Sequence, residues 1–137
     1  MISHSKKIEF IVPGVPKAQP RPRVRKAGDK AWAYYPKGVG PWKESLAAYC
    51  SQNRPSDPIE GPIRLDVSFF LPRPKNMKSR MDCEPHIKKP DSDNLLKAVM
   101  DSMNDIFWND DSQVCDVRVR KFYAEGGKEG ALITLEW

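Results

Sequence analysis

The chain is short and basic. It has 137 residues, and 23 Lys and Arg against 18 Asp and Glu give a formal net charge of +5 at pH 7. This length predicts a single domain over residues 1–137, with no room for a separate second module. No apolar run approaches the roughly 20 residues that cross a bilayer, and the first residues lack the apolar core of a signal peptide. We therefore expect a cytoplasmic protein, and its three isolated cysteines suit reduced thiols in that compartment.

The first part of the chain combines a strand with a basic segment. Apolar residues alternate over residues 8–12, which predicts a strand. Residues 1–54 carry eleven Lys and Arg against three Asp and Glu, a net of +8, whereas residues 55–137 carry twelve against fifteen, a net of −3. We expect Arg21, Arg23 and Arg25, which alternate in an extended segment, to contact DNA phosphates. The alternative is a solvated basic loop.

The middle of the chain predicts a helix, a strand and a long loop. Pro41 suits the first turn of a helix. The apolar stripe of this helix consists of Trp42, Leu46, Tyr49 and Cys50. Apolar residues then occupy every second position from 63 to 71, which indicates a long half-buried strand. Residues 72–90 are rich in proline and basic residues and poor in apolar ones, so we expect a loop that borders a site.

The next segment gathers acidic side chains and a lysine on a predicted amphipathic helix. Asp91 or Ser92 is placed to cap its first turn. At about 100° per residue, Asp93, Lys97 and Asp101 fall on one face. The apolar side consists of Leu95, Leu96, Val99, Met100, Met103 and Phe107. Taken singly, these residues also suit a plain helix cap and a row of i,i+4 ion pairs on a solvated face.

A second acidic pair, Asp110 and Asp111, lies between this helix and a strand predicted over residues 113–122. A turn rich in Asn and Asp is expected at such a junction for local hydrogen bonding alone. A helix that returns to a strand pairing near its own start would also bring Asp111 toward Asp91 and Asp93. Clustered carboxylates repel one another unless a cation lies between them, and oxygen ligands suit Mg²⁺ or Mn²⁺. The pattern indicates metal-assisted phosphodiester chemistry.

The end of the chain completes an α/β (α+β) pattern. Residues 126–130 predict a hairpin connection into a last strand, whose apolar face consists of Ala131, Ile133, Leu135 and Trp137. The expected fold is one small domain with a mixed β-sheet of about four strands and two main helices. Among the aromatic residues, Trp42 and Trp137 suit the core or a dimer interface. Trp108 suits an anchor for the loop that presents Asp111, and Trp32 is a candidate for lining a DNA groove.

Two stretches resemble a known family. Residues 89–101 read Lys-Pro-Asp-Ser-Asp-Asn-Leu-Leu-Lys-Ala-Val-Met-Asp, and residues 108–114 read Trp-Asn-Asp-Asp-Ser-Gln-Val. Both closely resemble the signature of RusA-type Holliday-junction resolvases. These are small, dimeric, Mg²⁺-dependent endodeoxyribonucleases of bacteria and their phages and prophages. The first strand, with residues 13–17 and 21–23, also looks like the opening of this family.

The resemblance implies catalytic roles for four residues. It places Asp91, Asp93 and Asp111 as metal-coordinating aspartates and Lys97 as the essential lysine. Where some members have an arginine before the first aspartate, this chain has Pro90, so the basic contact with DNA falls to Lys88 or Lys89. A further departure is Met100, at a position where some members have an aromatic residue.

The sequence thus predicts a homodimer that resolves four-way DNA junctions by paired hydrolysis in recombination and repair. We expect Mg²⁺ as the cofactor, with Mn²⁺ as a substitute, and neither a nucleotide cofactor nor a membrane partner. One alternative is a less selective nuclease for flaps or replication forks. Another is a non-catalytic DNA-binding protein whose acidic site only stores a metal. Cleavage of junction, flap and duplex DNA with Mg²⁺ or EDTA separates these functions.

Overall fold

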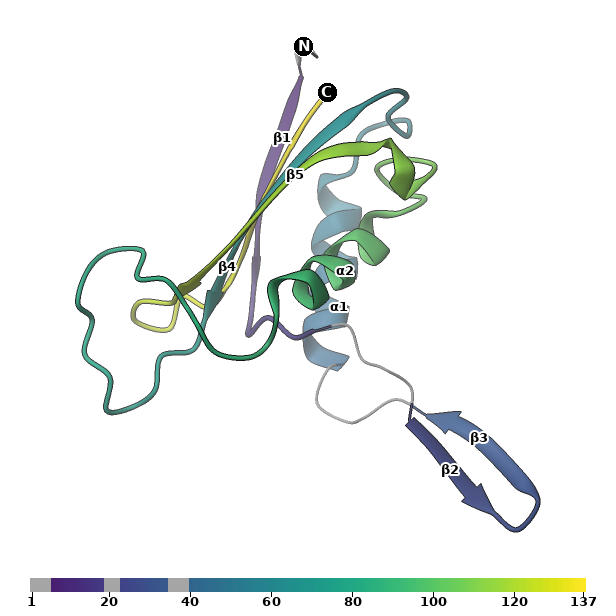
Figure 1. Ribbon diagram of the computed structural model, residues 1–137. Helices are drawn as coiled ribbons and strands as arrows, with labels where there is room; N and C mark the ends of the chain where they lie inside the picture. The colour runs from purple at the N-terminus through teal and green to yellow at the C-terminus, as the bar shows by residue number, and fades with distance from the viewer. Residues whose placement is uncertain (1–5, 19–22, 35–39) are drawn as a thin grey trace.

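A four-stranded mixed sheet forms the centre of the computed structural model, which describes residues 6–18, 23–34 and 40–137 (Figure 1). The strand order is β1-β6-β4-β5. The strands are β1 (Lys7–Pro13), β4 (Ile63–Leu71), β5 (Val114–Tyr123) and β6 (Gly130–Glu136). β6 pairs antiparallel with both β1 and β4, and β5 pairs parallel with β4. The predicted mixed sheet is confirmed.

Two helices cover one face of this sheet. They are α1 (Gly40–Asn53) and α2 (Ser92–Met103), which pack against each other (Figure 1). A parallel pair of strands needs a crossover connection, and α2 lies in the crossover from β4 to β5. The helix therefore runs back along the sheet, opposite in direction to the strand that follows it. No helix in the described part of the chain is long and apolar enough to cross a membrane.

The core lies between the sheet and the helices. In α2 the apolar stripe is buried through Leu95, Val99 and Met103, as the periodicity predicts. The helix ends at Met103, earlier than the apolar pattern suggests, because Asn104 leaves the helical conformation and Asp105 adopts a positive φ of 66°. The largest fully buried side chains are Trp108, Phe69, Phe107, Leu46, Ile63, Leu65, Leu71, Leu95, Met103, Ile133, Leu135 and Val12.

One expectation about the last strands is wrong. Residues 126–130 form a turn with positive φ at Gly126 and Gly127, but β5 and β6 are not a hairpin because β4 lies between them. The face of β5 that carries Cys115, Val117 and Val119 is less buried than the apolar face of β4. Val117 is 41% exposed, because β5 is the last strand of the sheet and has a neighbouring strand on one side only.

A basic hairpin, β2 (Arg23–Ala27) and β3 (Lys30–Tyr34), stands apart from the sheet (Figure 1). The alternating arginines indicate an extended segment but do not predict this hairpin, because they do not identify the strand with which the segment pairs. The turn contains Gly28 at a φ of 61°, a backbone conformation that favours glycine. The antiparallel register places Arg25 opposite Trp32.

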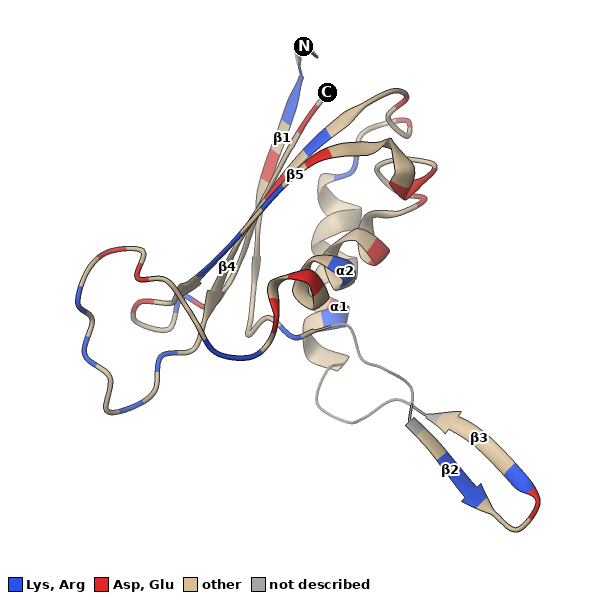
Figure 2. Ribbon diagram, in the orientation of Figure 1, with Lys and Arg blue, Asp and Glu red and all other residues tan. Residues whose placement is uncertain are grey.

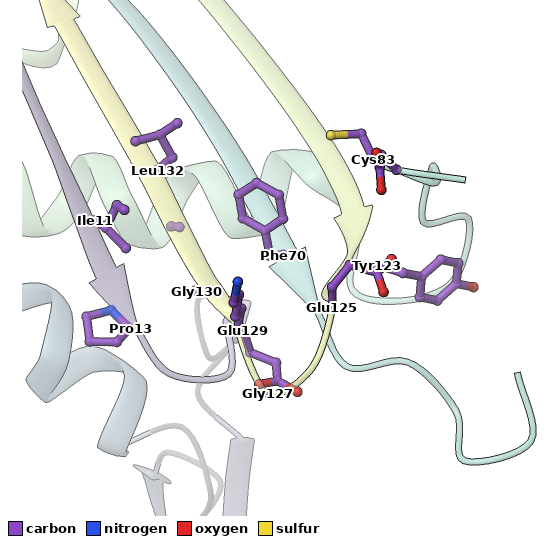
Figure 3. A pocket seen from close by; sticks show the side chains of 13 residues that line it. Ile11, Pro13, Phe70, Cys83, Tyr123, Glu125, Gly127, Glu129, Gly130 and Leu132 are labelled. Carbon is purple, nitrogen blue, oxygen red and sulfur yellow. The ribbon is translucent and has the colours of Figure 1, made fainter. Parts of the chain in front are cut away.

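The sheet face opposite the helices is open. A pocket of about 610 Å³ lies on it, lined by apolar residues that include Ile11, Phe70 and Leu132 (Figure 3). Ile11 is 64% exposed, since the alternation that buries Phe10 and Val12 turns it outward. The pocket lining contains none of the predicted site residues.

The long loop over residues 72–90 is fixed by a clamp at its base. Arg73 donates hydrogen bonds to the carboxylates of Glu84 at 2.9 Å and Glu125 at 2.8 Å. The hydrogen bond from Arg73 lowers the pKa of Glu84 below its usual value, so this carboxylate stays ionised. A backbone bond from Tyr123 to Glu84 adds to the clamp. The loop therefore enters α2 from a defined position.

Candidate active site

The helix α2 begins at the first predicted site residue. Asp91 is its N-cap and has an extended backbone, but its side chain makes no capping hydrogen bond. Its carboxylate instead binds the ammonium group of Lys89, with N–O distances of 3.0 and 3.2 Å. The Lys89 side chain is 86% exposed, and such surface ion pairs contribute little free energy. The carboxylate of Asp91 is therefore accessible to a more strongly bound cation.

The segment before Asp91 is held by a residue that the sequence does not single out. Lys121, on β5, donates from Nζ to the carbonyl oxygens of Lys88 at 2.7 Å and Pro90 at 2.8 Å. These bonds tie the sheet to the start of α2. The sequence carries no signal for them, because the acceptors are backbone carbonyls of a distant loop.

One face of α2 carries the other predicted residues of this segment. Asp93 and Lys97 are exposed and lie one turn apart, and Asp101 follows after another turn. No ion pair within the described part of the chain involves any of these residues, so the alternative row of i,i+4 pairs is not formed. Asp93 lies in the first turn of α2, where the positive end of the helix dipole favours a carboxylate.

Asp111 is held by a buried tryptophan. The Nε1–H group of Trp108, whose side chain is fully buried, donates to Oδ1 of Asp111 at 2.8 Å. Trp108 therefore anchors the segment that presents Asp111, as its position in the sequence predicts. In the described residues no donor reaches the second carboxylate oxygen of Asp111.

The neighbouring acidic residue, Asp110, has a structural role. It is the N-cap of the short 3-10 helix η1 (Asp111–Gln113) and accepts a hydrogen bond from the backbone N–H of Ser112. The Gln113 side chain accepts a bond from the Asp110 backbone, which completes a capping box. The bond from Ser112 lowers the pKa of Asp110 below its usual value. Asp110 thus orients η1 and thereby its neighbour Asp111.

Asp111 does not come back to Asp91 and Asp93 within one chain, so this expectation is wrong. Trp108, which binds Asp111, forms a bridge with Asn104 at the C-terminal end of α2, whereas Asp91 caps the N-terminal end. Acidic residues accordingly lie at both ends of α2 (Figure 2). The 12 residues of α2 span about 18 Å, far more than the separation of two ligands on one cation. Among the described residues, no group of three or more His, Cys, Asp or Glu side chains could hold a metal.

The predicted DNA-binding residues lie in two places. Lys88 and Lys89 are exposed beside Asp91. Arg25 is exposed on β2, where the register pairs it with Trp32, which is 48% exposed. Arg23 is the first residue of β2, and Arg21 lies outside the described residues. The hairpin carries basic residues (Figure 2), and the exposed aromatic ring of Trp32 lies beside them.

A comparison of sequences relates this chain to known proteins. Residues 13–136 match the family described as endodeoxyribonuclease RusA. The chain belongs to the RusA family. It is 38% identical over 126 residues to the uncharacterised protein YqaN of Bacillus subtilis, covering 86% of this chain and 89% of YqaN.

Two further RusA relatives carry names that describe an activity. The chain is 29% identical over 116 residues to the crossover junction endodeoxyribonuclease of Lactococcus phage r1t, covering 82% of this chain and 85% of the phage protein. It is 38% identical over 73 residues to the crossover junction endodeoxyribonuclease RusA of Escherichia coli K12, covering 51% and 58% of the two chains. The family resemblance of the sequence is confirmed.

Nucleases of the RusA family depend in general on a divalent metal. In this chain Asp91 and Asp93 supply carboxylates at one end of α2, and Asp111 supplies one at the other end. One chain alone therefore does not assemble the expected ligand set. The assignment of these three residues as ligands remains a prediction.

Proposed function

We propose that this RusA-family protein is a homodimeric, Mg²⁺-dependent endonuclease that resolves Holliday junctions by paired phosphodiester hydrolysis in DNA recombination and repair. The proposal rests on three exposed side chains at the start of α2, those of Asp91, Asp93 and Lys97. They lie within the region that matches the family. There Asp91 makes no capping bond, and Asp93 and Lys97 make no ion pair within the described residues. These side chains are thus available for substrate and cofactor. The names of two relatives support junction cleavage.

In this proposal Mg²⁺ is the native ion, and Mn²⁺ substitutes for it. The ion supplies Lewis-acid activation of water and phosphate when it is bound. Lys97 binds the scissile phosphate or stabilises the negative charge that develops on it, from its position one turn after Asp93. Lys88 and Lys89 bind phosphates beside the cleaved bond.

The dimer has a further purpose in this proposal, which is to complete the metal site. Side-chain rotation does not close the separation between Asp111 and Asp91, because a carboxylate on a short side chain reaches only a few ångströms while α2 is about 18 Å long. In a two-fold pair the same surface of each copy meets its counterpart. Two α2 helices that lie antiparallel across the axis therefore bring Asp111 of one copy to Asp91 and Asp93 of the other, at both ends of the pair.

We assign the outer DNA contacts to the basic hairpin. Arg21, Arg23 and Arg25 bind backbone phosphates, and the exposed ring of Trp32 is placed to stack on a base or pack on a sugar. Such contacts are not specific for a base sequence. They hold the arms of a junction while the site at α2 acts on the strand.

The proposal is tested with a four-way junction that has a mobile core, a flap and a linear duplex of matched length. In Mg²⁺ we expect symmetric cuts in opposed strands of the junction, little cleavage of the flap and duplex, and none of any substrate in EDTA. Sequencing the product ends locates both cuts. Equal cleavage of flap and junction would favour a less selective nuclease. Tight binding without cleavage in either Mg²⁺ or Mn²⁺ would favour a non-catalytic DNA-binding protein.

The contribution of both copies is tested with heterodimers purified through two different affinity tags. In the first, one chain carries Asp91→Asn and Asp93→Asn and the other carries Asp111→Asn, so one of two shared sites is intact and one strand should be nicked. In the second, one chain carries all three substitutions and the other is wild type. Both shared sites are then incomplete, and no nicking is expected. If the second heterodimer nicked the junction and the first did not, each chain would hold its own site.

A further inference from the structure

The segment before α2 lies against the outer edge of β5. The backbone N–H of Tyr123 donates to the carbonyl of Glu84 at 2.9 Å, and the N–H of His86 donates to the carbonyl of Lys121 at 3.0 Å. β5 is the last strand in the order β1-β6-β4-β5, so these bonds occupy its second edge. Residues 84–86 therefore extend the sheet by a short antiparallel stretch, and they fix the approach of the chain to the site.

Backbone pairing with β5 ends at His86. Beyond it, the Lys121 side chain forms the hydrogen bonds to this segment. The Lys121 ammonium group donates to the carbonyl of Lys88 at 2.7 Å and to the carbonyl of Pro90 at 2.8 Å. Hydrogen bonds from a charged donor are shorter and stronger than bonds between neutral groups. Lys121 thus holds the segment at three positions, once through its own carbonyl and twice through its ammonium group, up to the residue directly before Asp91.

The Asp91 carboxylate has little else to set its position. Its side chain makes no capping bond, and its partner Lys89 has a side chain that is 86% exposed. The Asp91 carbonyl accepts the first helical bond, from the N–H of Leu95 at 3.1 Å. The direction of the Asp91 side chain therefore follows from the backbone path through residues 88–91, and Lys121 holds that path.

We propose that Lys121 is a positioning residue of the metal site, which acts through the carbonyls of Lys88 and Pro90 to aim the Asp91 carboxylate. The proposal rests on the proposed function, since it takes Asp91 to bind the divalent ion. It goes further by assigning a role to a residue on β5 that touches neither the ion nor DNA. Two backbone carbonyls engage its ammonium group, which leaves at most one of its three N–H donors for a phosphate.

The test compares Lys121→Met with Arg120→Met in the dimeric protein. Methionine keeps the aliphatic part of Lys121 and removes both bonds to the segment before α2. Arg120 is the matched control because it is the adjacent basic residue on β5 and points to the other face, where it binds Asp66 on β4 at 3.0 Å. General weakening of β5 affects both variants, whereas loss of positioning affects only Lys121→Met.

Three readouts are expected to single out Lys121→Met. Its Mn²⁺ affinity, measured by electron paramagnetic resonance without DNA, should fall by about 10- to 100-fold, as for other residues that orient a metal ligand. Backbone amides of residues 95–98, the first of α2 with helical hydrogen bonds, should exchange hydrogen faster in the metal-free protein, because the start of α2 loses its tie to the sheet. Junction affinity in EDTA should stay at the wild-type value. Arg120→Met should match the wild type in Mn²⁺ affinity.

A conservative variant provides the rescue. Lys121→Arg keeps the positive charge and several N–H donors, although its planar group is larger than an ammonium group. We expect it to restore part of the Mn²⁺ affinity and most of the protection of the first turn of α2. Failure of Lys121→Arg to exceed Lys121→Met in either readout would overturn the proposal.

Other results would also overturn it. If Lys121→Met kept the wild-type Mn²⁺ affinity and weakened junction binding in EDTA, Lys121 would be a DNA contact. Equal losses of Mn²⁺ affinity in Lys121→Met and Arg120→Met would indicate a general effect of β5. A wild-type protein that binds Mn²⁺ and responds to Lys121→Met as expected, but cuts no DNA, would support the positioning role and overturn the proposed function. The Mn²⁺ measurement therefore distinguishes failure of the positioning role of Lys121 from failure of the proposed nuclease function.

Discussion

Trp108 donates a 2.8 Å hydrogen bond from Nε1 to Oδ1 of Asp111, and its ring is fully buried in the core. The bond joins a predicted ligand to the buried core of the molecule. Because the indole cannot move without disturbing the core, this bond restrains the Asp111 carboxylate. A ligand that is held in this way needs no rearrangement when a cation binds.

Trp108→Phe tests this anchor. The substitution keeps an aromatic ring in the core but removes the Nε1–H donor that binds Oδ1 of Asp111. We expect a loss of stability of about 1–3 kcal/mol, as for other core substitutions, and a fall in cleavage rate of at least about tenfold. Phe107→Leu is a matched core control, since Phe107 is equally buried and does not bind Asp111. If both variants cut at the wild-type rate when folded, the Trp108 bond would have no functional role.

The three aspartates are predicted to act through a cation and not through the fold. Asp91→Asn, Asp93→Asn and Asp111→Asn should each abolish cleavage, while junction binding in EDTA persists or improves because anionic repulsion is relieved. Binding is measured by fluorescence anisotropy and cleavage by single-turnover kinetics. Asp101→Asn, on the same exposed helix face as Asp93, should keep most of the activity. Near-normal turnover in any of the first three variants would remove that residue from the ligand set.

Asp110 provides a control for Asp111 at the adjacent position. Asp110→Asn retains a side-chain oxygen that caps η1, and Asn is as good an N-cap as Asp. We expect this variant to fold and cut normally, whereas Asp111→Asn folds and does not cut. The opposite result would show that Asp110 is the ligand and that Asp111 has the structural role.

The strands of the sheet and the two helices were predictable from the sequence because these depend on local patterns. Alternation determines which side of β4 is buried, and the 3.6-residue period determines the inner face of α2. The position of Asp111 depends instead on the direction of β5 relative to α2. A parallel β4–β5 pair obliges α2 to run back along the sheet, so its two ends lie far apart. Residue spacing does not carry this information.

The hairpin and the hydrogen bonds of Lys121 could not be predicted from the sequence, for a related reason. Both depend on partners that no local pattern identifies, since Arg25 pairs with Trp32 across a turn and Lys121 binds backbone carbonyls of a loop. The anchoring role of Trp108, in contrast, is predictable from its own position next to Asn109 and Asp110. Local features were therefore predictable, and pairings across the fold were not.

The basic hairpin is predicted to bind phosphates of every DNA structure. Replacing Arg21, Arg23 and Arg25 by Ala should weaken binding to junction and duplex alike. It should also flatten the dependence of log K on log salt concentration by up to about 0.9 for each phosphate that is no longer neutralised. A control variant with Lys6, Lys7 and Lys128 replaced by Ala removes the same charge from other positions. An unchanged salt dependence in the arginine variant would indicate a solvated basic hairpin.

Lys97 is predicted to act on the chemical step. A helical ion pair with Asp93 or Asp101 would be worth only about 0.3–0.5 kcal/mol, and no such pair is present in the described residues. Loss of a group that stabilises transition-state charge has a much larger effect. We expect Lys97→Ala to change the melting temperature by only about 3 °C or less and the junction affinity by less than about tenfold. The single-turnover rate should fall by about a hundredfold or more, which corresponds to at least about 2.7 kcal/mol in the barrier.

A comparison with Lys97→Arg separates charge from geometry at this position. Arginine keeps the positive charge but presents a planar fork in place of a compact ammonium group. We expect Lys97→Arg to restore the junction affinity to the wild-type value while recovering only part of the rate, because transition-state stabilisation depends on placement of the charge. A Lys97→Ala protein that unfolds at a much lower temperature, yet cuts at the wild-type rate when folded, would show instead that Lys97 supports the helix and takes no part in the reaction.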